Sequence, residues 1–384
     1  MKLGSMPKKI SRELAKPAPP PESEPKRVVY LLGAGASQAD ISLKDETISI
    51  LMSSIREGIV RRIDREKIGI LEKVKNELVK EDLDVEHLIT LYESTGISEH
   101  ENIAKKLKSL FWKEIRDRIS KLGPNYQPRL LAALIDMHEI SELNERLHGI
   151  LTLNYEGLIE KAIQLVRPGA INYGLTIISK VRSPKTGHPV PLIKLHGSFN
   201  WKNEFPIALR SEGSIRSAEN VLWIPPGVEK KRERYPFNIL WGKARELLDC
   251  DILRIVGCSL NRNDWQLVSL LYTTQQLNTH QKEYIIELID FAKAGEIICA
   301  NYGYLNFRKI TAIREVIDYI RDSFAPVPAK EADFASAIKE LLSPGKNNIF
   351  DIWLRAKGDY MKKNNIPIST VKGIFRDYIN EVRG

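Results

Sequence analysis

Cysteine is scarce in this sequence and no apolar run is long, and both shortages exclude classes of protein. The 384 residues include three cysteines, Cys250, Cys258 and Cys299, with no CxxC pair among them. Three scattered cysteines argue against a disulfide framework and offer no four-cysteine zinc site, so we expect a cytoplasmic protein that binds no metal. The longest apolar runs, such as residues 130–135, fall far short of the roughly 18 residues that a membrane-spanning helix needs, which excludes a membrane protein.

The charge has no strong excess of one sign. Lys and Arg number 58 against 49 Asp and Glu, for a net charge of +9, and the first 27 residues alone carry +4 of it. No arginine-rich block and no alternation of basic with aromatic residues follows. We interpret the rest as a mildly basic solvated surface, and a nucleic-acid groove is the alternative that composition leaves open.

The amino-terminal segment differs in composition from the rest. Residues 1–27 hold six of the 20 prolines and show no apolar periodicity, which is typical of a flexible tail. The first five residues, MKLGS, look like a vector-derived extension before a natural start at Met6, and we expect no secretion signal.

Apolar periodicity predicts the fold class. A short buried strand at 28–32 runs into a glycine turn, and residues 40–147 have mostly helical spacing. Strands separated by helices of 10–15 residues then follow to about residue 290, which indicates parallel βαβ units. We therefore predict an α/β protein: a doubly wound, Rossmann-like parallel sheet over residues 28–325, with a large helical insertion at about 40–147, and a helical carboxyl-terminal region over 326–384.

Small or polar residues follow four of the predicted strands. Such positions lie at the carboxyl edge of a parallel sheet, where doubly wound folds bind nucleotides. Taken alone each signal is weak, and the first lacks the GxGxxG fingerprint because Gln38 stands at the sixth position. The segments are GAGAS, with Gly33, Ala34, Gly35 and Ser37; TLNYE, with Asn154; KLHGS, with His196; and VGCSL, with Gly257 and Ser259.

In this order and spacing the four segments resemble the sirtuin superfamily. More narrowly, the chain looks like the bacterial sirtuin-like NAD hydrolases of antiphage defence, a zinc-free branch of the kind paired with HerA-type ATPases. That likeness depends on Asn-Tyr-Glu at 154–156, on the KLHGSxxW run ending at Trp201, and on Pro225-Pro226 before a helix containing Trp241. It covers roughly residues 28–290 and implies an NAD-binding domain with NAD+ as substrate, a homo-oligomer, and a HerA-type ATPase partner.

Two departures from the sirtuin pattern limit what is carried over. The glycine loop continues as QADISLKDE without a Gly-Ile-Pro segment, so the loop over the nicotinamide end is expected to be built differently. The zinc module of deacylating sirtuins is missing, which removes part of the platform for an acylated lysine peptide.

The expected chemistry is cleavage of the nicotinamide–ribose bond through an oxocarbenium-like state. Because nicotinamide is a good leaving group, one base and an orienting group suffice, and we assign His196 as base or hydroxyl activator and Asn154 as the orienting residue. We expect Gly33, Gly35 and Ser37 to contact the pyrophosphate, and Gly257 and Ser259 to lie against the adenosine. Ala34 and Asn154 are expected to bind the NAD+ as well. The plainer interpretations are a turn-forming Asn154, a Cys258 that fills space, and an Asp264 that caps a helix.

The leading functional prediction is therefore an NAD+ hydrolase that yields nicotinamide and ADP-ribose and depletes NAD+ in infected cells. The alternatives are an NAD-dependent protein deacylase, a non-catalytic nucleotide-binding regulatory module and a DNA-associated scaffold. By position alone, the carboxyl-terminal helices are candidates for subunit or partner contacts.

Overall fold

The computed structural model of the protein describes residues 24–79, 84–169, 171–177, 189–211, 213–227, 232–279, 284–312, 315–316, 318 and 348–381. The predicted tail up to residue 23 and residues 326–347 of the predicted helical carboxyl-terminal region lie outside these ranges. In the described part of the chain, no helix is both long and apolar enough to cross a membrane.

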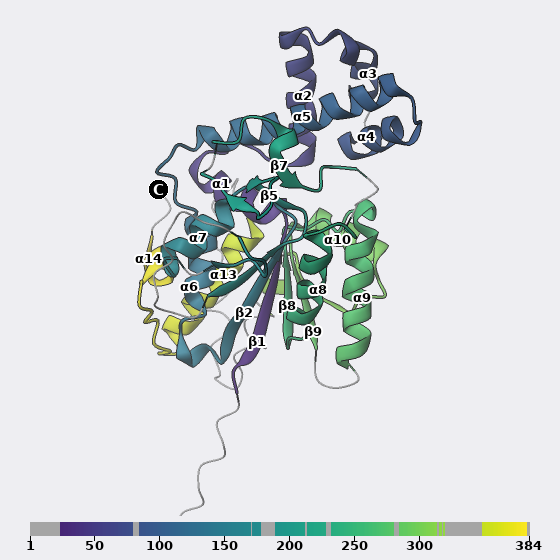
Figure 1. Ribbon diagram of the computed structural model, residues 1–384. Coiled ribbons are helices and arrows are strands. Elements are labelled where there is room, and N and C mark those ends of the chain that lie inside the picture. The colour runs from purple at the N-terminus through teal and green to yellow at the C-terminus, as the bar shows by residue number, and fades with distance from the viewer. Residues whose placement is uncertain are drawn as a thin grey trace, which may run out of the picture.

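A seven-stranded sheet forms the centre of the molecule, and each of its pairings is parallel (Figure 1). Strand β1 is central, and its residue Leu32 pairs with Thr152 on one side and Val256 on the other. Its last five residues are buried, as the continuous apolar run predicts for a strand covered on both faces. From edge to edge the strands are β10 (Phe307–Ile310), β9 (Ile285–Ile289), β8 (Ile252–Val256), β1 (Lys26–Leu32), β2 (Glu145–Thr152), β4 (Val190–Lys194) and β3 (Ile171–Asn172).

Helices cover both faces of this sheet (Figure 1). One layer holds α1 (Ala34–Lys44), α6 (Arg129–Met137), α7 (Leu158–Val166), α13 (Ile349–Lys363) and α14 (Ile374–Asn380), and the other holds α8 (Phe237–Leu247), α9 (Trp265–Thr279) and α10 (Ala292–Asn301). The chain builds outward from β1 through β2 and then returns to add β8 on its other side. The predicted doubly wound α/β fold is confirmed, and the order of strands reverses between β1 and β8.

Four helices between α1 and α6 project beyond the carboxyl edge of the sheet: α2 (Met52–Glu66), α3 (Gly69–Val79), α4 (Val85–Ser94) and α5 (Ser98–Lys121) (Figure 1). Within the range predicted as a helical insertion, α1 and α6 instead contact each other beside the sheet. A small antiparallel sheet of β6 (Ala208–Leu209), β5 (Gly197–Lys202) and β7 (Val221–Trp223) lies near α5, and three short 3-10 turns complete the described elements: η1 (Ser141–Leu143), η2 (Ala218–Asn220) and η3 (Arg262–Asp264).

Helix α13 belongs to the core of its own chain. Twelve of its 15 residues are buried, among them Trp353 and Lys357 with no exposed surface. The Lys357 ammonium lies 3.4 Å from a carboxylate oxygen of Glu145 at the start of β2. The suggestion that the carboxyl-terminal helices serve subunit contacts is therefore corrected for α13, because its apolar stripe is covered by the parent domain.

Candidate functional site

A cavity of about 440 Å³ lies where β1, β2 and β8 end, at the point where the strand order reverses. All four sequence segments contribute to its wall, although they are far apart in the chain. Of the predicted site residues, all except Ser37 line it: Gly33, Ala34, Gly35, Asn154, His196, Gly257 and Ser259. Residues 50–55, from the start of the helical insertion, close the cavity on the side of α2 and α5.

The loops after β1 and β8 pack closely together because each has a glycine, Gly33 or Gly257, at the point of contact. A Cβ atom on Gly33 would lie 2.4 Å from the carbonyl oxygen of Gly257, and one on Gly257 would lie 2.1 Å from the backbone nitrogen of Ala36. Gly257 also has a φ of +56°, which side chains other than glycine rarely adopt. The glycines therefore let two loops meet and bring the amino end of α1, with its partial positive charge, to the cavity.

Asn154 is held rigidly by its amide nitrogen. This Nδ2 lies 3.0 Å from the carbonyl oxygen of Gly33, 3.0 Å from Ser37 Oγ and 3.2 Å from Glu156 Oε1. The Ser37 hydroxyl in turn donates to Glu156 Oε1 at 2.6 Å. Ser37 is fully buried behind Asn154, so the structure places it in support of the asparagine and away from the cavity surface.

His196 faces a carboxylate across the cavity. Its Nε2 lies 3.6 Å from Asp264 Oδ1, which is longer than a hydrogen bond. The Tyr155 ring lies beside the imidazole, with ring centroids 6.2 Å apart. Burial holds the pKa of Tyr155 well above its ordinary value, so this ring is a neutral wall of the site.

Asp264 and Asp290 are site residues that sequence reasoning missed. Asp264 was expected only as a helix cap, and it does directly precede α9 while also lining the cavity. Asp290 directly follows β9, and burial raises its pKa to about 6. An acidic residue at the end of a late strand was the available signal, because parallel strands end at the same edge of a sheet.

The wall of the cavity is acidic. Glu86, Glu156, Asp264 and Asp290 line it, and no Lys or Arg occurs among the described residues that do. Burial raises the pKa of Glu156, although the Lys194 ammonium and the hydrogen bond from Ser37 oppose that shift. An acidic wall of this kind favours a positively charged ligand group. A negatively charged pyrophosphate would instead bind the backbone amides at the amino end of α1, where the helix dipole is positive.

Gln38 directly follows the glycine loop and bonds the segment that leads to the cavity wall. Its side-chain oxygen accepts from the backbone nitrogen of Ile50 at 2.8 Å, and its nitrogen donates to the carbonyl oxygen of Ile48 at 3.0 Å. These bonds fix the segment that carries residues 50–55 to the cavity. A buried glutamine therefore positions this wall without a Gly-Ile-Pro segment.

The predicted absence of metal stays a prediction. Within the described ranges, no group of three or more His, Cys, Asp or Glu side chains could hold a metal ion. Cys258 is buried, and burial raises the pKa of its thiol to about 12, which suits a filler better than a nucleophile.

Comparisons with known proteins find only remote similarity. No protein-family model and no curated protein matches the chain. Three solved structures of mutants of a Sir2 homologue in complex with ADP-ribose align with 73% of this chain and 92% of theirs, at 17% sequence identity and a TM-score of 0.34. The fold assignment follows from the strand order and register of this chain, and these three structural neighbours are structures of a Sir2 homologue.

Proposed function

We propose that the protein is an NAD+ hydrolase that cleaves the nicotinamide–ribose bond and releases nicotinamide and ADP-ribose. The observation that carries this proposal is the meeting of the glycine loop, Asn154 and His196 around one cavity at the switch point of the sheet. Doubly wound sheets bind nucleotides at this place, and the cavity volume lies within the range of roughly 300–1,000 Å³ typical of small-molecule sites.

The wall suggests how NAD+ would lie. The pyrophosphate fits the amino end of α1 at Gly33 to Gly35, and the adenosine fits the side of Gly257 and Ser259. Asp290 is adjacent to that side, because the Gly257 amide donates to the carbonyl oxygen of Ile289 at 3.1 Å, and its carboxylate can accept from a ribose hydroxyl. The nicotinamide ribose then falls between Asn154 and His196.

The residues at that end match the chemistry. With Nδ2 of Asn154 fixed by its acceptors, the amide oxygen is the group left to accept from a water or a ribose hydroxyl. His196 can take a proton near neutral pH, and Asp264 stabilises the imidazolium that forms. The acidic wall favours the oxocarbenium-like cation as positive charge moves from the nicotinamide ring to the ribose.

One experiment tests the reaction and separates it from the alternatives. The full chain is mixed with NAD+ alone, and free nicotinamide is followed by chromatography, with an acyl-lysine peptide added in a parallel arm. We expect nicotinamide release without peptide. Release that requires the peptide would identify a deacylase instead, and binding of ADP-ribose without turnover would identify a regulatory module.

The biological role that we propose is antiphage defence by NAD+ depletion, in a cytoplasmic homo-oligomer with a HerA-type ATPase partner. Its support is the sequence resemblance over residues 28–290. Cells that express the chain with its genomic neighbours should lose NAD+ after phage infection. Infected cells that keep their NAD+ and still survive would contradict the depletion mechanism.

A further inference from the structure

A second hollow, of about 480 Å³, lies on the other side of the segment that closes the NAD+ cavity. Thr47, Ile48 and Ser49 line this second hollow, whereas residues 50–53 line the cavity of the candidate active site. One short stretch between α1 and α2 therefore separates the two spaces. Around the second hollow stand five basic side chains and two carboxylates: Arg61, Arg62, Arg65, Arg118 and Lys121, with Glu114 and Asp117.

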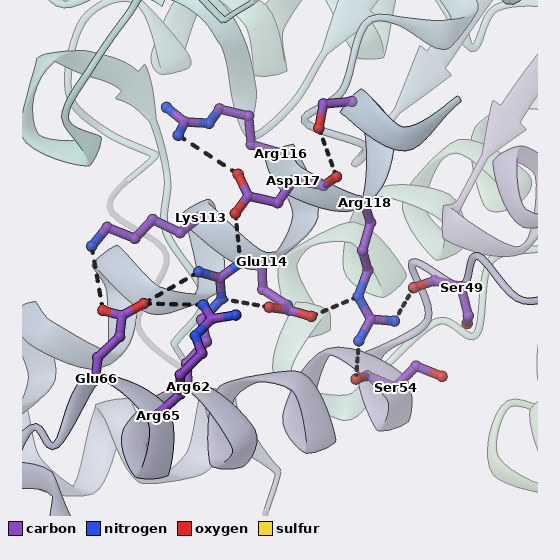
Figure 2. Close-up of polar contacts among 11 residues, drawn as sticks. Ser49, Ser54, Arg62, Arg65, Glu66, Lys113, Glu114, Arg116, Asp117 and Arg118 are labelled. Atoms are coloured by element: carbon purple, nitrogen blue, oxygen red, sulfur yellow. Dashed lines mark hydrogen bonds and ion pairs between the residues drawn. The ribbon is translucent and has the colours of Figure 1, made fainter. Parts of the chain in front are cut away.

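Both carboxylates are engaged by arginines, as Figure 2 shows, and Asp117 also lies 3.7 Å from Arg116 Nη2. Glu114 accepts from Arg62 Nε at 2.6 Å and from Arg118 Nε at 2.8 Å, and Asp117 accepts from Arg62 Nη2 at 2.6 Å. Gly58 makes room for this arrangement, since a Cβ atom there would lie 2.0 Å from Glu114 Oε1. The buried part of the network is close to electrical balance.

The remaining cations are exposed. The side chains of Arg61 and Arg65 are 67% and 68% exposed, and their nearest carboxylates, Glu57 and Glu66, lie at 3.7 and 3.4 Å. Lys121 ends α5, where the helix dipole favours positive charge. The lining thus has a net positive charge on a small concave surface. Arginine forks on such a surface match the oxygen geometry of phosphate groups.

Arg118 connects this hollow to the wall of the cavity. Its two terminal nitrogens donate to the backbone carbonyl oxygens of Ser49 and Ser54, the latter at 2.7 Å (Figure 2). These two residues flank residues 50–53, which line the cavity. Glu114 accepts from both Arg62, which lines the hollow, and Arg118, which holds the two ends of that segment.

We propose that this hollow binds a small polyphosphate anion, such as a nucleoside triphosphate or inorganic polyphosphate, and that its occupancy is coupled to the adjacent cavity through Arg118. The proposal that an anion binds here is argued from the residues of the hollow alone. Only the proposed coupling to the adjacent cavity depends on the proposed function. Because linkage is reciprocal, an anion that changes the affinity for ADP-ribose has its own affinity changed by the same factor.

The binding test uses calorimetry of the full chain with inorganic tripolyphosphate and with ATP, in the presence of excess ADP-ribose. The test variant is Arg61→Glu/Arg65→Glu, whose positions lie outside the buried network. The matched control is Lys105→Glu/Lys106→Glu, two exposed residues of α5 that do not line the hollow and that change the net charge equally. We expect binding to weaken by roughly 10-fold or more in the test variant and by less than about twofold in the control.

Several results would overturn the site. The proposal is wrong if the wild-type protein binds neither probe. It is also wrong if both variants lose the same affinity, because the anion would then respond only to the net charge of the surface. Binding of a DNA duplex with the same variant pattern, without binding of tripolyphosphate or ATP, would replace the small anion by nucleic acid. Stronger binding of ATP than of tripolyphosphate supports a nucleotide, and equal binding supports the phosphate chain as the recognised part.

The coupling test measures backbone hydrogen exchange in residues 47–54 and the affinity for ADP-ribose, each with and without tripolyphosphate. We expect both to change in the wild-type chain, the affinity by about threefold or more, and neither to change in Arg61→Glu/Arg65→Glu. Tripolyphosphate that binds and leaves both readouts unchanged would overturn the coupling alone. A chain that fails to bind ADP-ribose contradicts the proposed function, while the calorimetry still decides the anion site.

Discussion

Two buried polar clusters on the same sheet are built in opposite ways. Under α13, Arg254 donates to Glu145 at 2.7 Å and to Glu287 at 2.6 Å, and Lys357 lies beside Glu145. Burial by itself raises the pKa of Glu145, but the positive charges of Arg254 and Lys357 hold this pKa well below its usual range. Each charge in this cluster has an opposite charge close to it, and the cluster fastens a helix to three strands.

The cluster at the carboxyl edge is compensated less completely. Glu156 and Asp290 line the cavity, burial raises the pKa of both, and no Lys or Arg is among the described lining residues. Burying carboxylates at a raised pKa destabilises the folded state at neutral pH, and such sites are typical of binding and catalysis. The cluster under α13 therefore stabilises this fold, whereas the carboxylates at the carboxyl edge face a cavity.

The largest expected effect breaks the paired cluster. Arg254→Met should lower the free energy of unfolding by about 3–5 kcal/mol, because it leaves Glu145 and Glu287 buried without their main cation. Urea unfolding followed by circular dichroism measures this loss. Arg146→Met, at an exposed position of β2, is the control and should change little. Adding Glu287→Gln to Arg254→Met should recover part of the lost stability. If Arg254→Met alone is as stable as the wild type, the cluster does not stabilise the fold.

The next effect separates catalysis from stability at the other cluster. His196→Ala or Asn154→Ala should reduce nicotinamide release by roughly 10²-fold or more while NAD+ binding and thermal stability change much less, because in the proposed reaction both groups act on the transition state. His148→Ala, on β2 and outside the cavity, is the matched control. Full activity in His196→Ala together with loss in His148→Ala would place the base elsewhere.

A smaller effect is a pH dependence at Asp290. Its folded pKa of about 6 exceeds the ordinary value of 3.8, so its contribution to stability is present below pH 3.8 and is lost as pH rises through 6. Asp290→Asn retains the acceptor for the Phe291 amide and should therefore be more stable than wild type at pH 7, by about 1–2 kcal/mol. The difference should vanish near pH 4 in thermal melts. A constant difference across that range would exclude titration of Asp290 as the cause.

The smallest effect concerns Ser37. The sequence predicted a pyrophosphate contact, and Ser37→Ala would then weaken binding more than turnover. The hydroxyl instead bonds Asn154 and Glu156 behind the wall, so we expect kcat to fall by ~3- to 10-fold with KM nearly unchanged. Ser37→Thr, which keeps the hydroxyl, is the conservative comparison, and steady-state kinetics of both variants decide between the two roles. A rise in KM with kcat unchanged would instead support a contact between Ser37 and the pyrophosphate.

Short-range patterns in the sequence determined the elements of this fold and the order of its site segments. The apolar run at 28–32, the glycine loop after it and the spacing of later strands required only local periodicity and turn chemistry to interpret. Because parallel strands end at one edge, these patterns were also sufficient to bring Asn154, His196 and Gly257 to one cavity.

Tertiary structure alone decided the roles that depend on distance across the chain. Asp264 faces His196, Ser37 lies behind Asn154, and α13 packs against α1 and α14, each through contacts that the local sequence pattern does not specify. Periodicity says which face of an element is apolar and nothing about which distant element covers it. Whether a buried carboxylate meets a cation, as Glu145 does, or faces a cavity, as Asp290 does, is therefore settled only when the strands and helices pack together.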